Sequence, residues 1–190
     1  PKALQQTREG VEHVGNIVKA MKDFSHIGSE TEMQAEDINH AIETTLTISK
    51  NEWKYVADIE LRLDKEMPKV FCYIGEIKQV LLNLIVNASH AVADKQKISE
   101  QNSQKGAITV SSYYDETVAT VAVMDSGMGI DESDRAKIFD PFFTTKEVGK
   151  GTGQGLSVAY QIIVDKHGGN IWFESEKGKG TTFYFSLPMK

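Results

Sequence analysis

Residues 107–130 read AITVSSYYDETVATVAVMDSGMGI, and this stretch decides the fold. Apolar and polar residues alternate over 107–114 and again over 117–124, and Asp115-Glu116 separates the two runs. Two alternating runs with a short polar break between them predict an antiparallel hairpin. The second strand leads into Asp125-Ser-Gly-Met-Gly129, whose glycines permit a tight turn. The Asp125 carboxylate can accept a hydrogen bond from an exocyclic amine such as N6 of adenine, although a purely structural turn is the alternative.

The segment before the hairpin is predicted to be a helix over 75–94. Asn83 and Asn87 are four residues apart, so both amides lie on one side of this helix. An amide oxygen can bind a hard divalent cation and an amide NH₂ can donate to a phosphate oxygen, so the pair suits a metal-phosphate group. Two solvated or capping amides are the alternative. The apolar residues form a separate arc beside the amides: Ile77, Val80, Leu81, Leu84, Ile85, Ala88 and Val92.

The segment after the hairpin is rich in glycine and phenylalanine. Gly149-Lys-Gly-Thr-Gly-Gln-Gly155 directly precedes a predicted helix that stops at Gly168-Gly169. Backbone N–H groups at a helix N-terminus favour anions, and Lys146 or Lys150 adds positive charge nearby. A loop without a ligand is the alternative. Upstream of the glycines, Phe139, Phe142 and Phe143 predict a hinged flap that docks on an apolar surface, with ordinary core residues as the alternative.

The other predicted elements complete one mixed fold. A helix begins near Asp37, a residue type that suits an N-cap, and ends near 53–55. A polar connector is expected over 94–106 and a short helix over 131–138. Strands are predicted over 58–64, 70–73, 171–175 and 182–187. Helices and hairpin strands in this order predict an α+β class, two-layer α/β sandwich with a mixed, mostly antiparallel sheet and helices on one face.

The first residues form a separate unit in this interpretation. Residues 4–24 carry a narrow apolar stripe at helical spacing, which suits a bundle or coiled-coil helix; a helix that lies on its own domain is the alternative. Residues 28–36 are polar and lack periodicity, as expected of a hinge. We therefore expect a helical unit over 1–27, a hinge over 28–36 and one domain over 37–190.

Composition narrows the classes of protein to consider. The chain has 190 residues, 40% hydrophobic and 25% charged, which is enough for one globular domain and a short appendage. Its net charge of −6 argues against binding to nucleic acid. The only cysteine, Cys72, excludes an internal disulfide and fits a reducing compartment. No apolar run is long enough to span a membrane, so we expect a cytoplasmic domain without membrane contact. The absence of an initial Met suggests a piece of a longer protein, whose membrane anchorage the sequence leaves open.

Two common phosphate-binding motifs are missing. A Walker loop fails because Thr144 and Phe173 stand where a glycine should precede the two Gly-Lys pairs. The dinucleotide motif fails because Glu132 and Leu156 stand where its third glycine should be. Any bound nucleotide must therefore be held by another arrangement.

Five segments, in this order, closely resemble the boxes of the catalytic and ATP-binding domain of sensor histidine kinases. That domain belongs to the superfamily of DNA gyrase, heat-shock chaperones, histidine kinases and mismatch-repair ATPases, which share the Bergerat ATP-binding fold. The resemblance covers about residues 37–188, and residues 4–24 resemble the end of a dimerisation hairpin. The segments are Asn83-x-x-x-Asn87, Asp125-Ser-Gly-Met-Gly129, Phe139-Asp-Pro-Phe-Phe143, Gly151-Thr-Gly-Gln-Gly155 and Gly180-Thr-Thr-Phe183.

The resemblance implies a role for each matching position. Asn87 is the implied Mg²⁺ ligand, Asn83 its neighbour on the phosphate side, and Asp125 the acceptor for the adenine amine. Residues 139–150 form the implied lid, and Thr182 is a second contact near the adenine. The implied catalytic residues are Asn83, Asn87 and His90. The implied ATP-binding set is Asn83, Asn87, Asp125, Gly127, Gly129, Ile130, Lys146, Lys150, Gly151, Thr152, Gly153, Gln154, Gly155, Leu156 and Thr182.

Two departures from the family pattern bear on function. His90 stands where many histidine kinases have a lysine, so that phosphate contact is weaker or comes from the lid lysines. ATP-hydrolysing relatives have a glutamate at the position of Asn83, and an amide has no useful basicity for activating water. The resemblance thus implies transfer of the γ-phosphoryl group of Mg-ATP rather than hydrolysis. A catalytically idle nucleotide-sensing or dimerising module and an ATP hydrolase are the alternatives.

The phosphoacceptor is expected outside this chain. None of the five histidines stands in the family's acceptor box, and His26 lacks the following proline. The resemblance therefore implies an acceptor histidine on an upstream dimerisation domain, relay to a response regulator, and a homodimeric parent. His13 and His40 are expected at the surface, and His167 is expected as a cation at a helix C-terminus.

Overall fold

The computed structural model describes residues 32–98, 104–146 and 153–189. The helix expected over 4–24 lies outside these ranges, as do Lys150, Gly151 and Thr152 of the predicted site. No helix in the described ranges combines the length and the apolar character that crossing a bilayer requires.

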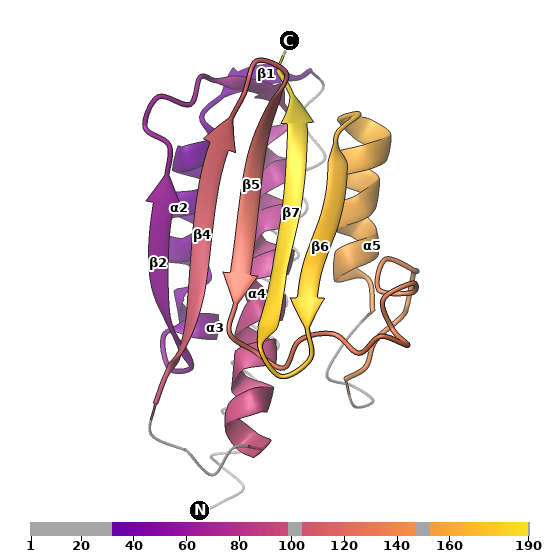
Figure 1. The fold of residues 1–190 in the computed structure, drawn as a ribbon. Helices are drawn as coiled ribbons and strands as arrows, with labels where there is room; N and C mark the ends of the chain where they lie inside the picture. Colours follow the sequence, from indigo (N-terminus) through magenta and orange to yellow (C-terminus); the bar gives the residue numbers. More distant parts are fainter. Residues whose placement is uncertain (1–31, 99–103, 147–152, 190) are drawn as a thin grey trace, which may run out of the picture.

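A five-stranded sheet forms one layer of the domain (Figure 1). Its strand order is β2-β4-β5-β7-β6, and every neighbouring pair is antiparallel except β2 and β4. The predicted hairpin over residues 107–124 is confirmed as the central pair, β4 and β5. The strands are β2 (Ala57–Leu63), β4 (Gly106–Tyr114), β5 (Val118–Asp125), β6 (Asn170–Glu176) and β7 (Gly180–Pro188).

Helices form the second layer, on one face of the sheet (Figure 1). The longest is α4, whose length accommodates the crossover between the parallel strands β2 and β4. Asp37 caps α2 as predicted, because its Oδ1 accepts the backbone N–H of His40 at 2.9 Å. The predicted two-layer α+β sandwich is confirmed. The helices are α2 (Ile38–Ile48), α3 (Lys50–Trp53), α4 (Ile74–Ile98), α5 (Gly155–Tyr160) and the π-helical turn η1 (Gln161–Lys166).

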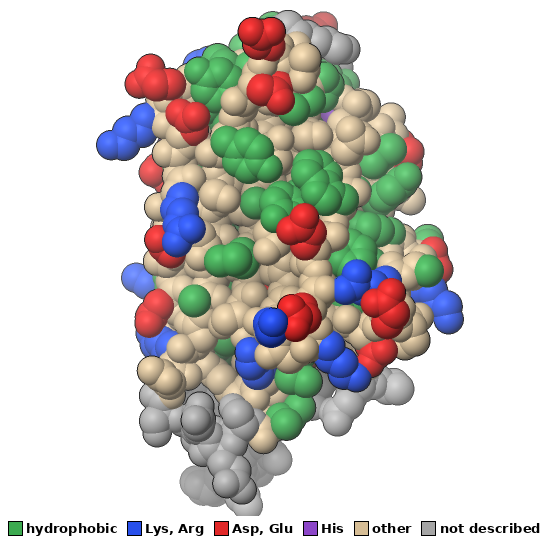
Figure 2. Space-filling model, viewed as in Figure 1, with side chains coloured by type: hydrophobic (Ala, Val, Ile, Leu, Met, Phe, Trp, Pro, Cys, Tyr) green, Lys and Arg blue, Asp and Glu red, His purple; other side chains and the backbone are tan. Residues whose placement is uncertain are grey.

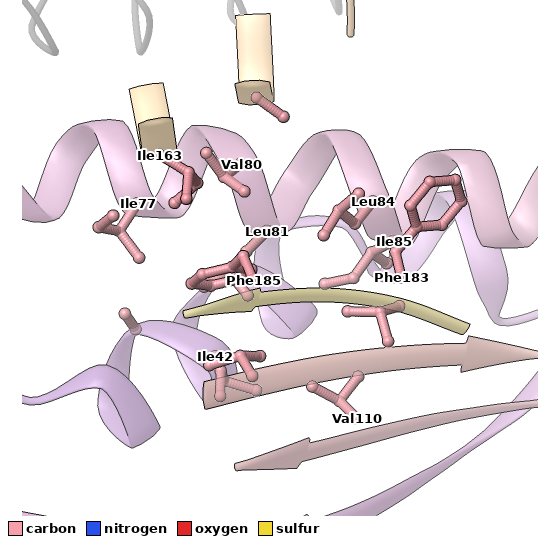
Figure 3. Packing of buried hydrophobic residues seen from close by; sticks show 14 of the residues in the cluster. Ile42, Ile77, Val80, Leu81, Leu84, Ile85, Val110, Ile163, Phe183 and Phe185 are labelled. Carbon is pink, nitrogen blue, oxygen red and sulfur yellow. The ribbon is translucent and has the colours of Figure 1, made fainter. Parts of the chain in front are cut away.

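The apolar arc of α4 forms the centre of the core. All seven residues predicted for this arc are buried, and they pack against Val110 of β4 and Phe183 and Phe185 of β7 (Figure 3). Ile42 of α2 and Ile163 of η1 join the same cluster. Burying a side chain of this size contributes roughly 1.5–3 kcal/mol, so this face of α4 is held firmly. Asn83 and Asn87 lie on the neighbouring edge of α4, outside this buried arc.

A small second sheet changes the interpretation of the hinge. Strand β1 (Gln34–Glu36) pairs antiparallel with β3 (Val70–Cys72), at the end of the domain where β5 begins (Figure 1). Three residues assigned to the predicted hinge over 28–36 are therefore joined to the domain by backbone hydrogen bonds. The remaining boundaries of the helical unit and the hinge stay a prediction.

Two local predictions were wrong. Residues 131–138 form successive turns rather than a helix, with i to i+3 bonds such as Asp134 N to Asp131 O at 3.0 Å. The predicted connector over 94–106 begins later, because α4 continues to Ile98. Its last turns are anchored from the side: Lys95 Nζ donates to Ser126 O at 2.8 Å, and Gln96 Nε2 donates to Val56 O at 2.8 Å.

His167 is also placed differently from the prediction. It does follow the last helical turn, but it is buried and its ring bridges two elements. Its Nε2 accepts the backbone N–H of Tyr73 at 3.1 Å, and its Nδ1 lies 2.7 Å from Ile162 O. Because Nε2 accepts, the ring is neutral and Nδ1 carries the proton. His167 therefore links the residue before α4 to η1 as a neutral bridge, not as the cation expected at a helix C-terminus.

Within the part of the chain that the structure describes, no helix covers the other face of the sheet. Figure 2 shows hydrophobic side chains gathered on the middle of this face, with charged residues around them. Trp172 of β6, 38% exposed, stacks on Tyr184 of β7 with ring centroids 5.2 Å apart. The two faces thus differ, and the functional residues predicted from sequence gather on the helical side.

Candidate functional site

A cavity of about 650 Å³ opens between α4, the loop after β5 and the start of α5. Its walls come from segments far apart in the sequence: the polar edge of α4, residues 125–146, the turn before α5 and the start of β7. The lining residues predicted from sequence are Asn83, Asn87, His90, Asp125, Ile130, Lys146, Gly153, Gly155 and Leu156.

Asp125 forms one end of the cavity, at the last position of β5. The residue is only 5% exposed, and its Oδ1 accepts the backbone N–H of Gly127 at 2.7 Å. Burial raises the pKa of the Asp125 carboxyl from 3.8 to about 6, against the opposing effects of the N–H groups of Gly127 and Thr181 and the charge of Lys95. At neutral pH this end of the cavity therefore presents a carboxylate that accepts hydrogen bonds.

Two glycines let the loop after β5 fold tightly against its neighbours. A Cβ at Gly127 would lie 2.6 Å from the backbone of Ala91 on α4. Gly129 has a φ of 70°, and a Cβ there would lie 2.2 Å from Glu176 O in the β6–β7 turn. Neither glycine lines the cavity, so their part is to bring the loop close to α4 and to the turn.

Thr181, not Thr182, lines the cavity beside Asp125. Side chains alternate along β7, and Thr181 shares the face of Phe183 and Phe185, which pack in the core. The predicted adenine contact of Thr182 stays a prediction. Thr182 pairs with Met124 and Glu174 and lies on the uncovered face. The same alternation was present in the sequence and could have identified Thr181.

A second part of the cavity lining, called here the helix end, gathers three groups from α4 and the segment before α5. Lys146 Nζ lies 3.3 Å from Asn87 Oδ1 and 2.7 Å from His90 Nδ1. Because an ammonium only donates, His90 accepts through Nδ1 and is neutral. Burial first, and then the charge of Lys146, lower the pKa of His90 below 6.5. Burial also lowers the pKa of Lys146 below 10.5, while Asp94 acts in the opposite direction. This end therefore combines a cation, an amide oxygen and a neutral imidazole.

Asn83 connects the two sides of the cavity. Its Nδ2 donates to Gly155 O at 3.0 Å and so holds the first residue of α5 against α4. A Cβ at Gly155 would lie 3.5 Å from the Asn83 amide, which shows how closely the two elements approach. Asn83 is thus engaged with the backbone at the start of α5, whereas Asn87 faces the cavity with Lys146.

The predicted flap is partly fixed to the core. Phe139 packs against Tyr160 and Phe173, with ring centroids 5.7 Å and 6.2 Å away, and Phe143 also packs on the core. Phe142 is 70% exposed and has a φ of 66°, a conformation that bulky residues rarely adopt. A Cβ at Gly153 would lie 2.4 Å from the carbonyl carbon of Phe142, so the two ends of this segment meet. Two of the three phenylalanines anchor the segment, and the third projects outward.

The cavity contains residues that the sequence analysis did not select. Gln154, which it did select, is exposed and precedes α5 without lining the cavity. Most of the added residues are apolar or hydroxyl side chains that carry no motif of their own, and only their position in the fold identifies them. They include Met128, Ile138, Thr144, Thr181 and Phe183.

The arrangement has a definite chemical character. One end offers a buried carboxylate that accepts hydrogen bonds, and the other offers an ammonium and an amide oxygen. Apolar side chains such as Ile130, Leu156 and Phe183 line the same cavity. A ligand with an amine at one end, a flat apolar body and an anionic group at the other would match all three parts.

Comparison with known proteins agrees with a cavity that binds such a ligand. The family model described as "Histidine kinase-, DNA gyrase B-, and HSP90-like ATPase" matches residues 73–190. Sensor kinase CckA of Brucella abortus is 44% identical over 138 residues, which are 69% of this chain and 14% of that protein. The signal transduction histidine-protein kinase AtoS of Escherichia coli is 32% identical over 180 residues, which are 94% of this chain and 28% of that protein. The chain therefore spans less than a third of either of these curated relatives.

Solved structures of histidine kinases are also similar to this chain. The nucleotide-free catalytic domain of histidine kinase ThkA has a TM-score of 0.68 and 33% identity, over 83% of this chain and 96% of that one. A structure of ThkA in complex with response regulator protein TrrA has a TM-score of 0.66 and 31% identity, over 96% of this chain and 49% of that one.

Proposed function

The chain belongs to the family of histidine kinase-, DNA gyrase B- and HSP90-like ATPases and contains the catalytic, ATP-binding domain of a two-component sensor histidine kinase, and we propose how its cavity holds ATP. The adenine lies at Asp125, and the phosphates lie at Asn87 and Lys146. The observation that carries this orientation is the contrast between the two ends of one cavity: a buried acceptor at Asp125 and a cation at Lys146.

The residues at the phosphate end fit a magnesium ion. Asn87 Oδ1 faces the cavity and accepts the Lys146 ammonium at 3.3 Å, so this oxygen is oriented toward a cation. Amide oxygens suit Mg²⁺, which takes its remaining ligands from phosphates and water. When bound, Mg²⁺ would neutralise charge on the β- and γ-phosphates. With Mg²⁺ on Asn87 Oδ1, the Lys146 ammonium would no longer bind this oxygen and would be available to the phosphate oxygens.

Transfer to a supplied nucleophile fits this site better than hydrolysis. A hydrolase needs a base that activates water, which typically contributes about 10²–10⁴-fold to the rate. Asn83 is an amide and its NH₂ is already engaged with Gly155 O at 3.0 Å. We therefore favour phosphoryl transfer over the ATP hydrolase and over the idle module.

The partners follow from the reaction. The nucleophile is a histidine on an upstream dimerisation domain, and the phosphoryl group passes on to a response regulator, as in the pairing that the ThkA structure with TrrA describes. Outside residues 1–31, the histidines here are His40 on the exposed side of α2, His90 at the site and the buried bridge His167. The full-length protein acts as a homodimer, and this domain works in the cytoplasm.

A thermal-shift titration with Mg-ATP tests the binding site. A ligand that binds only the folded state raises stability by RT ln(1 + [L]/Kd), so wild-type protein should show a rising melting temperature. Asp125→Asn and Asn87→Ala should both abolish the shift, whereas Asn51→Ala on the exposed side of α3 should retain it. An unchanged shift in both site variants would refute the proposed orientation.

Transfer is tested with γ-labelled ATP and an added dimerisation domain that carries the acceptor histidine. We expect an acid-labile, base-stable label on the added domain and none on the chain alone. Steady release of phosphate by the chain alone, lost in Asn87→Ala, would favour the hydrolase. ATP binding without any transfer to the added domain would favour the idle module.

A further inference from the structure

We propose that Ser175, a residue outside the cavity, is a positioning residue that fixes the hydroxyl of Thr181 as a hydrogen-bond acceptor and thereby makes the site select a purine with an exocyclic 6-amino group. This inference rests on the proposed placement of the base at Asp125. It adds Ser175, which lies outside the five sequence segments, to the determinants of base choice.

Ser175 lies at the centre of a small hydrogen-bond network behind the cavity wall. It is half-buried on β6, directly opposite Thr181 of β7 in the sheet register. Its Oγ accepts the backbone N–H of Ile130 at 2.8 Å, donates to Gly180 O at 3.1 Å and lies 2.9 Å from Thr181 Oγ1. Ser175 thus contacts the loop after β5 and the start of β7 together, while only Ile130 and Thr181 reach the cavity.

Either hydroxyl can donate in the contact between Ser175 and Thr181, and the other partners of Ser175 favour one direction. A serine hydroxyl has one hydrogen to donate and two lone pairs that accept. The proposal assigns the Ser175 hydrogen to Gly180 O and one lone pair to the Ile130 N–H, so the second lone pair remains for Thr181. Thr181 therefore donates its only hydroxyl hydrogen to Ser175, and its oxygen has only lone pairs left for the cavity.

The cavity then has two neighbouring acceptors at the base end. Asp125 and Thr181 are paired residues on β5 and β7, each 5% exposed, and both line the cavity. An amino group with two N–H donors suits two acceptors, whereas a carbonyl oxygen in the same place faces lone pairs on both sides. A site built to pair with a polar group rejects an analogue that lacks the donor, because buried acceptors are left unpaired.

Nearby contacts hold the network in place without lining the cavity. Gly178 N donates to Met128 O at 2.6 Å, and the Arg135 guanidinium donates to Ser175 O. The Lys177 ammonium pairs with Asp131. The β6–β7 turn is therefore joined to residues 128–135 along its whole length, which keeps Ser175 and Thr181 in register with the loop.

The test compares ATP with inosine triphosphate, which has a carbonyl in place of the 6-amino group. Dissociation constants are measured by calorimetry for the 190-residue chain and for Ser175→Ala, Ser175→Thr and Thr181→Val. We expect wild-type protein to prefer ATP, and Ser175→Ala to reduce the preference about tenfold, because the freed Thr181 hydroxyl can rotate and donate to the carbonyl. Ser175→Thr retains the hydroxyl and should restore the wild-type ratio.

Thr181→Val removes the acceptor without disturbing the bonds from Ser175 to Ile130 and Gly180. It should lower the preference to a similar extent, and adding Ser175→Ala to it should change the ratio no further. If Ser175→Ala weakens both nucleotides equally, or if Thr181→Val leaves the ratio unchanged, Ser175 is only structural and the inference is wrong. An unchanged ratio in Thr181→Val refutes the inference even if Ser175→Ala fails to fold.

Asp125→Asn separates this inference from the proposed function. If that variant binds ATP as well as wild-type protein does, the base does not lie at Asp125 and both proposals fail together. If it loses ATP binding while the Ser175 and Thr181 variants keep the wild-type ratio, the placement of the base stands and only the role of Ser175 is refuted.

Discussion

The two ends of the cavity are built from different kinds of structure. Asp125 and Thr181 are adjacent residues on paired strands, almost fully buried and held by backbone N–H groups. Asn87 and His90 lie on one helix edge, and their partner Lys146 comes from a segment without regular structure. The strand end is thus formed before any ligand binds, whereas the helix end depends on one long, flexible side chain.

This difference suggests a division of tasks. A preformed pair of acceptors recognises the base with little loss of conformational entropy. A lysine that moves from Asn87 to the phosphates links the arrival of the nucleotide to a change in the segment that carries it. We therefore expect changes at the base end to alter whether nucleotide binds, and changes at the other end to alter what happens to its phosphates.

The largest effect is expected from Gly180→Ala at the base end. Gly180 has a φ of 136°, and a Cβ there would lie 1.9 Å from Asp125 O. Strain and overlap together should lower the free energy of unfolding by about 3–4 kcal/mol, measured by urea denaturation. Gly178→Ala in the same turn is the matched control, since it has a φ of 82° but open space, and should lose only about 1 kcal/mol. Equal losses would show that the close approach to Asp125 is unimportant.

Asp125→Asn should weaken ATP binding about 100-fold, by removing a charged acceptor that is buried and already oriented. Isothermal titration calorimetry measures the change. Asp58→Asn, an exposed carboxylate on β2, should bind ATP like wild-type protein. If Asp125→Asn loses less than threefold in ATP affinity, the base does not lie at Asp125, and the proposed contrast between the two ends is wrong.

Lys146→Met at the other end should weaken ATP binding only about tenfold, because one charge-assisted hydrogen bond to phosphate is lost. In the absence of nucleotide, the same change should raise the pKa of His90, since the Lys146 charge contributes to its lowering. NMR titration of the His90 ring measures this directly. Lys137→Met, an exposed change in the preceding turns, should leave the pKa of His90 where it is. If Lys146→Met changes neither the ATP affinity nor the pKa of His90, Lys146 has no part in the site.

The smallest effect is a pH dependence. As the pH rises, the stability of the free protein should fall, whereas the stabilisation that ATP adds should increase. The pKa of Asp125 is raised to about 6 in the folded state from 3.8, so the folded protein binds this proton more tightly. The associated stability is fully present below about pH 4 and is lost as the pH rises through about 6. In the proposed orientation ATP binding uses the carboxylate, so the increase in melting temperature that ATP produces should grow over the same range. Melting curves from pH 5 to 8 with and without ATP show both trends, and Asp125→Asn should remove them.

Much of this molecule follows from local sequence. Alternation predicted β4 and β5, and spacing predicted the buried arc of α4, because the periods of strand and helix are properties of the backbone alone. The amides on α4 and the carboxylate after β5 were selected because polar groups at such positions need a ligand or a partner. Thr182 was selected from the sequence, whereas the residue that lines the cavity is Thr181, on the same face of β7 as Phe183 and Phe185.

Other features were decided only by the tertiary structure. The contact of Lys146 with Asn87 and His90 joins residues 59 and 56 positions apart, and the contact of His167 with Tyr73 joins residues 94 apart. No local pattern contains such pairs, because they depend on which surfaces meet when α4 packs on the sheet. The role of Ser175 is of the same kind: an ordinary serine in a strand acquires its importance from three partners that only the folded chain brings together. Sequence determined the elements and their polar residues, and packing determined which of those residues share a site.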